Sequence, residues 1–196
     1  MITLSYNDLK TIQKAMSYAW FDGRMDLNVI GIRRADPKTD SYDDTLFVAF
    51  RDILHHPTVY SFPITTEPGI STLKNPQNPQ GTAILMPGQY RGLWNIGSHK
   101  GCPALVQVKP CTVIRDHNRD DIRDYDSPRK ETGIFGINLH SVDPLDYQTV
   151  VGNWSAGCQV IPIRMYKDFI LDLVKMQGKV IGSTSISYTL LMEAAL

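Results

Sequence analysis

The chain has 196 residues, of which 42% are hydrophobic and 20% charged, and its 20 basic side chains balance its 20 acidic ones. This length fits one domain with its own core, and the composition is typical of a globular protein. Because no excess of positive charge attracts phosphates, we expect no nucleic acid partner. The three cysteines are an odd number, which favours free thiols in a reducing compartment over a disulfide framework.

The first twenty residues do not resemble a secretion signal, because Asp8 and Lys10 interrupt any apolar stretch. No later segment approaches the roughly 18 apolar residues of a membrane span. We therefore expect synthesis in the cytoplasm without a signal peptide, and no insertion into a membrane. Apolar residues recur at three- and four-residue spacing over residues 5–20, which predicts a helix there. We treat residues 1–25 as an N-terminal helical extension.

Short β-rich runs follow, separated by clusters of the residues that favour turns. We predict strands at 27–34, 45–50, 58–66, 83–90, 105–116, 134–140 and 185–192. The proline within the third run favours an edge strand or a bulge. The segments 67–83 and 117–133 are predicted to be loops.

A second helix is predicted at 165–178, where Phe169 and Ile170 begin an apolar face and Gly178 is placed as the stop. Many short strands with a helix near each end, at about 6–20 and 165–177, predict an α+β fold. We expect a single domain over residues 1–196.

The stretch NWSAGCQVIP, residues 153–162, raises the question of reactive chemistry. A cysteine nucleophile needs a base within hydrogen-bond reach and donors for the oxyanion that forms on the attacked carbonyl. His140 ends an apolar strand, and seventeen residues separate it from Cys158, enough for one loop and one strand. Small residues before Cys158 allow a tight turn, since Gly157 permits backbone angles that other residues resist. The other candidate bases are His55, His56, His99 and His117, of which His99 lies in a glycine-rich loop.

Other readings of these residues remain open. Cys158 can be a small buried core residue. Asp116, Asn118 and Asp120 imitate the first half of a calcium loop, but the glycine and the glutamate that complete such a loop are missing. No pair of histidines or cysteines has zinc-site spacing. We therefore predict no metal and no cofactor.

GINLH, seventeen residues, and then SAGC resemble the L,D-transpeptidase (YkuD-type) signature, in which a histidine precedes Ser/Thr-His-Gly-Cys by a gap of this order. His140, Ser155, Gly157 and Cys158 match that pattern. Ala156 departs from it, because the family usually has a second histidine there. The two residues after the cysteine, Gln159 and Val160, depart as well.

The resemblance implies a β-rich L,D-transpeptidase-like core and acyl transfer on peptidoglycan stem peptides. Cys158 would be the nucleophile and His140 its base, oriented by a backbone carbonyl. Ser155 and Gly157 would shape the turn and the oxyanion site, with amides near Gly157 and Cys158 holding the oxyanion. Candidate substrate-binding residues are Arg91, Arg115, Arg119, Asn138 and Gln159.

The expected signal-less synthesis favours hydrolysis by a phage lysis enzyme released through a holin, or by an antibacterial effector delivered by a contractile machine. An alternative is a non-enzymatic virion or cell-wall-binding module that keeps the fold. A papain-like or NlpC-like amidase ranks lower, because there the cysteine precedes the histidine and begins a helix. The oligomeric state is left open.

Overall fold

The computed structural model describes residues 2–34, 40–142 and 146–196. Across these ranges strands predominate, and three α-helices accompany them. The predicted α+β class is confirmed. The strands are β1 (Asn28–Arg33), β2 (Asp44–Arg51), β3 (Pro57–Ile64), β4 (Thr82–Leu85), β5 (Gly88–His99), β6 (Cys102–Gln107), β7 (Cys111–Asp116), β8 (Lys130–Gly133), β9 (Leu139–Ser141), β10 (Gln159–Ile161) and β11 (Ile186–Met192). The helices are α1 (Tyr6–Ala15), α2 (Ile70–Lys74) and α3 (Arg164–Ile181), with a final 3-10 turn at Glu193–Ala195.

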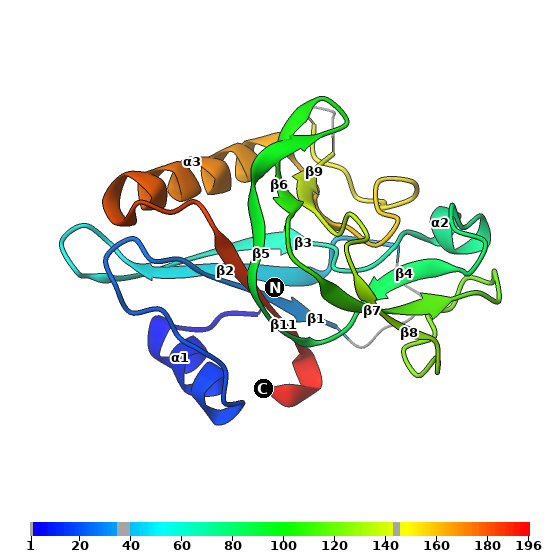
Figure 1. Cartoon of the computed structure of the whole chain (residues 1–196), viewed down its shortest axis with the longest axis horizontal. Coiled ribbons are helices and arrows are strands. Elements are labelled where there is room, and N and C mark those ends of the chain that lie inside the picture. Colours follow the sequence, from blue (N-terminus) through cyan, green and yellow to red (C-terminus); the bar gives the residue numbers. More distant parts are fainter. Residues whose placement is uncertain (1, 35–39, 143–145) are drawn as a thin grey trace.

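The large sheet has eight strands in the order β10-β9-β6-β5-β11-β1-β2-β3. Its two edge strands approach each other, because Thr65, just after β3, exchanges two backbone hydrogen bonds of 2.9 Å with Val160 of β10. The sheet therefore nearly closes into a barrel. A smaller sheet, β4-β7-β8, lies beside it (Figure 1).

Helices cover both faces of the large sheet. In Figure 1, α3 lies above the strands and α1 below them. Alternate residues of β1 serve the two sides: Val29 joins the cluster that contains Ile170 and Val174 of α3, whereas Ile30 joins the one that contains Leu9 of α1. Burial on both faces explains why β1 and β2 read as continuous apolar runs.

The C-terminal ends of both predicted helices were wrong, for reasons visible in the backbone. The helix α1 starts at a capping box in which Ser5 and Asp8 bond each other's backbone N–H, but it ends at Ala15 and not at residue 20, because Ser17 takes a left-handed conformation with φ of 59°. The helix α3 runs through Gly178 and ends at Ile181, and Gly182, with φ of 73°, supplies the left-handed cap.

Strand boundaries were predicted less well than strand existence. Strands β1, β2 and β11 lie where the apolar runs placed them, and β3 is an edge strand, as Pro63 within it predicted. The predicted strand 83–90 is two strands, since the chain passes from the small sheet to the large one around Pro87.

The predicted loop 67–83 contains α2 and the start of β4, and the predicted loop 117–133 ends in β8. Of the predicted strand 134–140, only its last two residues are in a strand, β9. Among the described helices, none has the length and apolar character needed to cross a membrane.

Candidate active site

The strands β9 and β10 place His140 beside the turn that carries Cys158. They pair in parallel with Val160 opposite His140, and Cys158 directly precedes β10. One ring nitrogen of His140, one of His99 and the sulfur of Cys158 all lie within 4.8 Å of one another. All three cysteines of the chain are free thiols.

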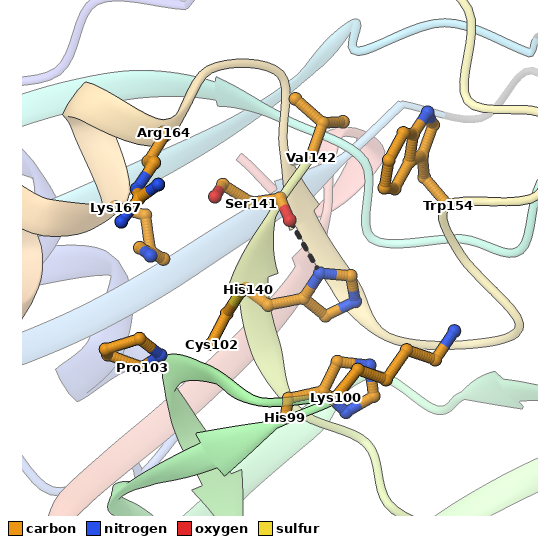
Figure 2. Close-up of a pocket in the computed structure, with 10 residues that line it drawn as sticks. All are labelled: His99, Lys100, Cys102, Pro103, His140, Ser141, Val142, Trp154, Arg164 and Lys167. Carbon is orange, nitrogen blue, oxygen red and sulfur yellow. Dashed lines mark hydrogen bonds between the residues drawn. The ribbon is translucent and has the colours of Figure 1, made fainter. Parts of the chain in front are cut away.

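The ring of His140 presents a bare nitrogen. Its Nδ1 lies 2.9 Å from the carbonyl of Ser141 (Figure 2), which can only accept, so Nδ1 carries the proton and donates. Its Nε2 is buried and has no hydrogen-bond partner among the described residues. The pKa of His140 is lowered to about 4, chiefly by burial and also by nearby His99 and Lys100, although the hydrogen bond to Ser141 acts to raise it. The imidazole is therefore a neutral base.

The thiol of Cys158 is half-buried and donates to the carbonyl of Gly136 at 3.2 Å. Burial raises its pKa, while the backbone N–H of Asn138 and the charge of Lys100 lower it. The site at neutral pH therefore holds a neutral thiol next to a neutral imidazole, and the proton has to move as the sulfur attacks.

The turn before the nucleophile is fixed by Ser155 and Gly157. The Ser155 hydroxyl donates to the carbonyl of Cys158 at 2.8 Å and accepts from the Gly157 amide at 3.2 Å. Gly157 has φ of +118°, and a Cβ there would lie 2.4 Å from the carbonyl oxygen of Ala83. Only glycine fits this position.

These bonds correct one expectation about the oxyanion. The amide of Gly157 points to Ser155 and not toward a substrate. The amide of Cys158 has no hydrogen-bond partner in the described part of the chain. Ala156 offers no side-chain donor. The turn therefore keeps the Cys158 amide free next to the sulfur, and the Ala156 amide has no partner among the described residues either.

His99 is the member of the site that sequence reasoning placed wrongly. It ends β5 in a hairpin with Cys102 opposite, and the two-residue turn Lys100–Gly101 has φ of 50° and 82°, as in the primed turns of tight hairpins. Its ring stacks on that of His140 with centroids 4.5 Å apart. The pair Lys100–Gly101 between two β-rich runs was the sequence signal that could have predicted this hairpin.

Of the predicted substrate-binding residues, only Asn138 touches this group, through a 3.0 Å bond from its Nδ2 to Nδ1 of His99. Gln159 is fully buried and accepts from the Tyr188 hydroxyl at 2.8 Å. It packs in the core of the sheet and has no surface to offer a substrate.

The three predicted arginines lie elsewhere. Arg115 is buried, pairs with Glu131 at 3.0 Å and lines a separate pocket that includes Ala156. Arg91 stacks over Phe21 at the opposite end of β5 from His99. Arg119 is exposed in a turn, with φ of 64°.

The cations that lie near His140 are not the three predicted arginines. A pocket opens at His140 and is lined by His99, Lys100, Cys102, Pro103, His140, Ser141, Val142, Trp154, Arg164 and Lys167 (Figure 2). No carboxylate is among the described residues that line it. Its cations come from the β5–β6 hairpin and from the first turn of α3, two segments whose proximity the sequence analysis did not predict. The Lys167 side chain is 2% exposed and pairs with Asp168 at 3.0 Å.

Two imidazole nitrogens and a thiol sulfur at this spacing are also the kinds of ligand atom that zinc and other soft metal ions prefer. The hydrogen bonds oppose this use, however. The Asn138 oxygen accepts from the Gln107 amide at 2.8 Å, so its NH₂ faces Nδ1 of His99, and the ring proton of His99 has to sit on Nε2. Neither nitrogen of His99 is then open to a metal.

No protein-family model and no curated protein matches this chain. The chemistry of the site therefore has to be inferred from its own residues.

Proposed function

We propose that the protein is a cysteine acyl-transfer enzyme that cleaves or exchanges peptide bonds in peptidoglycan stem peptides. The observation that carries the proposal is the buried, bare Nε2 of His140 in the same small cluster as the Cys158 thiol. A buried base nitrogen that has a fixed tautomer and no hydrogen-bond partner lowers the stability of the fold. Its presence beside a thiol therefore favours a catalytic use, as the base in nucleophilic catalysis.

In the first step, Nε2 of His140 takes the thiol proton as the sulfur of Cys158 bonds to the carbonyl carbon. The carbonyl π electrons move to oxygen and form a tetrahedral oxyanion. When the oxyanion collapses, the carbon–nitrogen bond breaks and the leaving amine takes the proton from His140. A thioester remains on Cys158. Water then completes hydrolysis, or an amine completes an exchange.

The proposed substrate class rests on two features. GINLH and SAGC resemble the L,D-transpeptidase signature, and the structure adds the Ser141 carbonyl as the group that orients His140. The pocket at His140 also gathers Lys100, Arg164 and Lys167. Stem peptides carry carboxylates, which such cations attract. This substrate lies in the cell wall, which is where the protein would act.

The test is incubation of the purified protein with Gram-negative sacculi, followed by mass spectrometry of the released muropeptides. Cys158→Ala is the control for the nucleophile, and Cys102→Ala, which removes another half-buried thiol, is the matched control for the loss of a thiol. We expect new products with the wild type and with Cys102→Ala, and none with Cys158→Ala. Loss of a terminal residue indicates a carboxypeptidase, split dimers an endopeptidase, and new dimers a transpeptidase.

A second candidate is a cell-wall-binding module without activity. Ala156 in place of the family's histidine and the occupied amide of Gly157 favour it. Unchanged muropeptides with folded wild type that co-sediments with sacculi would support this candidate and refute the enzyme.

A further inference from the structure

The turn that carries Cys158 has no free side-chain donor for an oxyanion, because the Ser155 hydroxyl donates to the Cys158 carbonyl. Oxyanion holes usually aim more than one preorganised donor at the developing charge. The Gly157 amide is held by Ser155. The backbone amides of Ala156 and Cys158 have no hydrogen-bond partner among the described residues. A side-chain donor, however, has to come from outside residues 155–158, because Ala156 and Gly157 have no polar side chain.

A chain of hydrogen bonds fixes which nitrogen of His99 carries its proton. The amide of Gln107 donates to the Asn138 oxygen at 2.8 Å, which sets the orientation of the Asn138 side chain. The Asn138 nitrogen then lies 3.0 Å from Nδ1 of His99. Because an NH₂ group can only donate, Nδ1 is the acceptor and Nε2 bears the hydrogen.

The stacked rings of His99 and His140 are therefore opposite tautomers. His140 has its proton on Nδ1 and an open acceptor at Nε2. His99 has its acceptor filled and an N–H at Nε2. Burial lowers the pKa of His99, and the charge of Lys100 lowers it further, so this donor is a neutral imidazole at pH 7. The Lys100–Gly101 turn and the ring stacking hold it in place.

We propose that His99 is a second catalytic histidine, whose Nε2–H donates to the oxyanion that forms when Cys158 attacks a carbonyl. This inference rests on the proposed acyl transfer. The Cys158 amide and His99 then form the two donors of the oxyanion site, while His140 alone moves the proton. His99 neither gains nor loses a proton in the cycle: it binds the negative oxygen as it forms and releases it when the carbon–nitrogen bond breaks.

Two assays separate this role from a purely structural one. Acyl transfer to a stem peptide requires stabilisation of an oxyanion. Alkylation of Cys158 by iodoacetamide takes place at a saturated carbon, so it needs the thiol and His140 but no oxyanion donor. The variant His99→Phe keeps a ring that can stack on His140 but removes the N–H. The variant His99→Gln restores an N–H donor of similar reach, and His117→Phe is an exposed control.

We expect His99→Phe to lower kcat for stem-peptide cleavage by roughly 10²–10³-fold, the usual cost of losing one oxyanion donor, while the alkylation rate of Cys158 stays within about threefold of wild type. His99→Gln should recover part of the lost kcat, and His117→Phe should change neither rate.

Equal losses in both assays for His99→Phe would overturn the inference, because they would mean that His99 only positions His140. An unchanged kcat would overturn it too. These results differ from failure of the proposed function itself, in which wild type leaves the stem peptide intact.

Discussion

Two polar clusters in this molecule, one fully buried and one partly so, are built in opposite ways. One, called here the Glu67 cluster, consists of Arg33, Glu67 and Arg123, whose side chains are at most 4% exposed. The other is the group of His99, His140 and Cys158. Arg33 and Arg123 approach Glu67 at 3.3 and 3.2 Å, whereas the second cluster keeps a buried nitrogen without a partner. Paired charges stabilise a fold only weakly but are costly to break. A base nitrogen without a hydrogen-bond partner, such as Nε2 of His140, is free to accept a proton.

The chain segment that contains Glu67 also contacts the segment that carries Cys158. The segment that carries Glu67 also carries Thr65, which bridges to Val160, and Gly69, whose amide donates to the Ser155 carbonyl at 3.0 Å. The Gly69 contact holds the turn before Cys158, and the Thr65 contact holds the start of β10 just after it. The comparison therefore separates a scaffold, in which changes affect stability, from a reactive group, in which changes affect rate.

The largest expected effect on stability is that of Glu67→Ala. Removing the carboxylate leaves Arg33 and Arg123 buried without their shared partner, which should lower the free energy of unfolding by about 3–5 kcal/mol. Urea unfolding measures this loss, best at pH 8, because burial raises the pKa of Glu67 to about 7 against the two arginines. His140→Phe is the contrast: its stability should stay within about 1 kcal/mol of wild type. Similar losses in the two variants would erase the distinction between the clusters.

Gly157→Ala should have an intermediate effect. The new Cβ meets the Ala83 carbonyl at 2.4 Å, and φ of +118° disfavours any side chain. We expect a loss of about 1–3 kcal/mol from backbone strain, and a larger loss of activity because the turn that carries Cys158 has to shift.

The control for this variant is Gly182→Ala, which has φ of +73° but open space around the added Cβ. It should lose about 1 kcal/mol and keep full activity. Equal activity in Gly157→Ala would mean that the turn tolerates a shift and does not set the position of the sulfur.

The sequence predicted the elements that depend on local patterns. The apolar runs of β1, β2 and β11 marked buried strands, and the spacing of GINLH and SAGC brought His140 and Cys158 together as candidates. It did not predict which cations reach the pocket, since Arg164 lies on α3 and Lys100 on a hairpin, and only tertiary packing brings them to His140. Gln159 was misjudged because a polar residue after a cysteine reads as a contact, yet it pairs with Tyr188 in the core.

The smallest expected effect at neutral pH, and the one that most sharpens the comparison, is the titration of His140. Burial lowers its pKa from 6.5 to about 4 in the folded chain. The base should therefore stay active well below pH 6.5, and kcat/KM for stem-peptide cleavage should fall only as the pH approaches about 4. An acid limb near pH 6.5 would show that the imidazole is solvated and that Nε2 is not held bare.

The same titration of His140 also makes the stability of the fold depend on pH. Between pH 6.5 and about 4 the unfolded chain binds a proton at His140 that the folded chain does not, so acidification through this window favours unfolding. From pH 6.5 to pH 5 the contribution lost is about 1.6 kcal/mol, since the slope reaches its full 1.36 kcal/mol per pH unit only once the unfolded chain is fully protonated at His140. His140→Phe should lose correspondingly less stability over this interval in urea unfolding. If wild type and variant decline in parallel, the buried nitrogen is not the group that ties the active site to the stability of the fold.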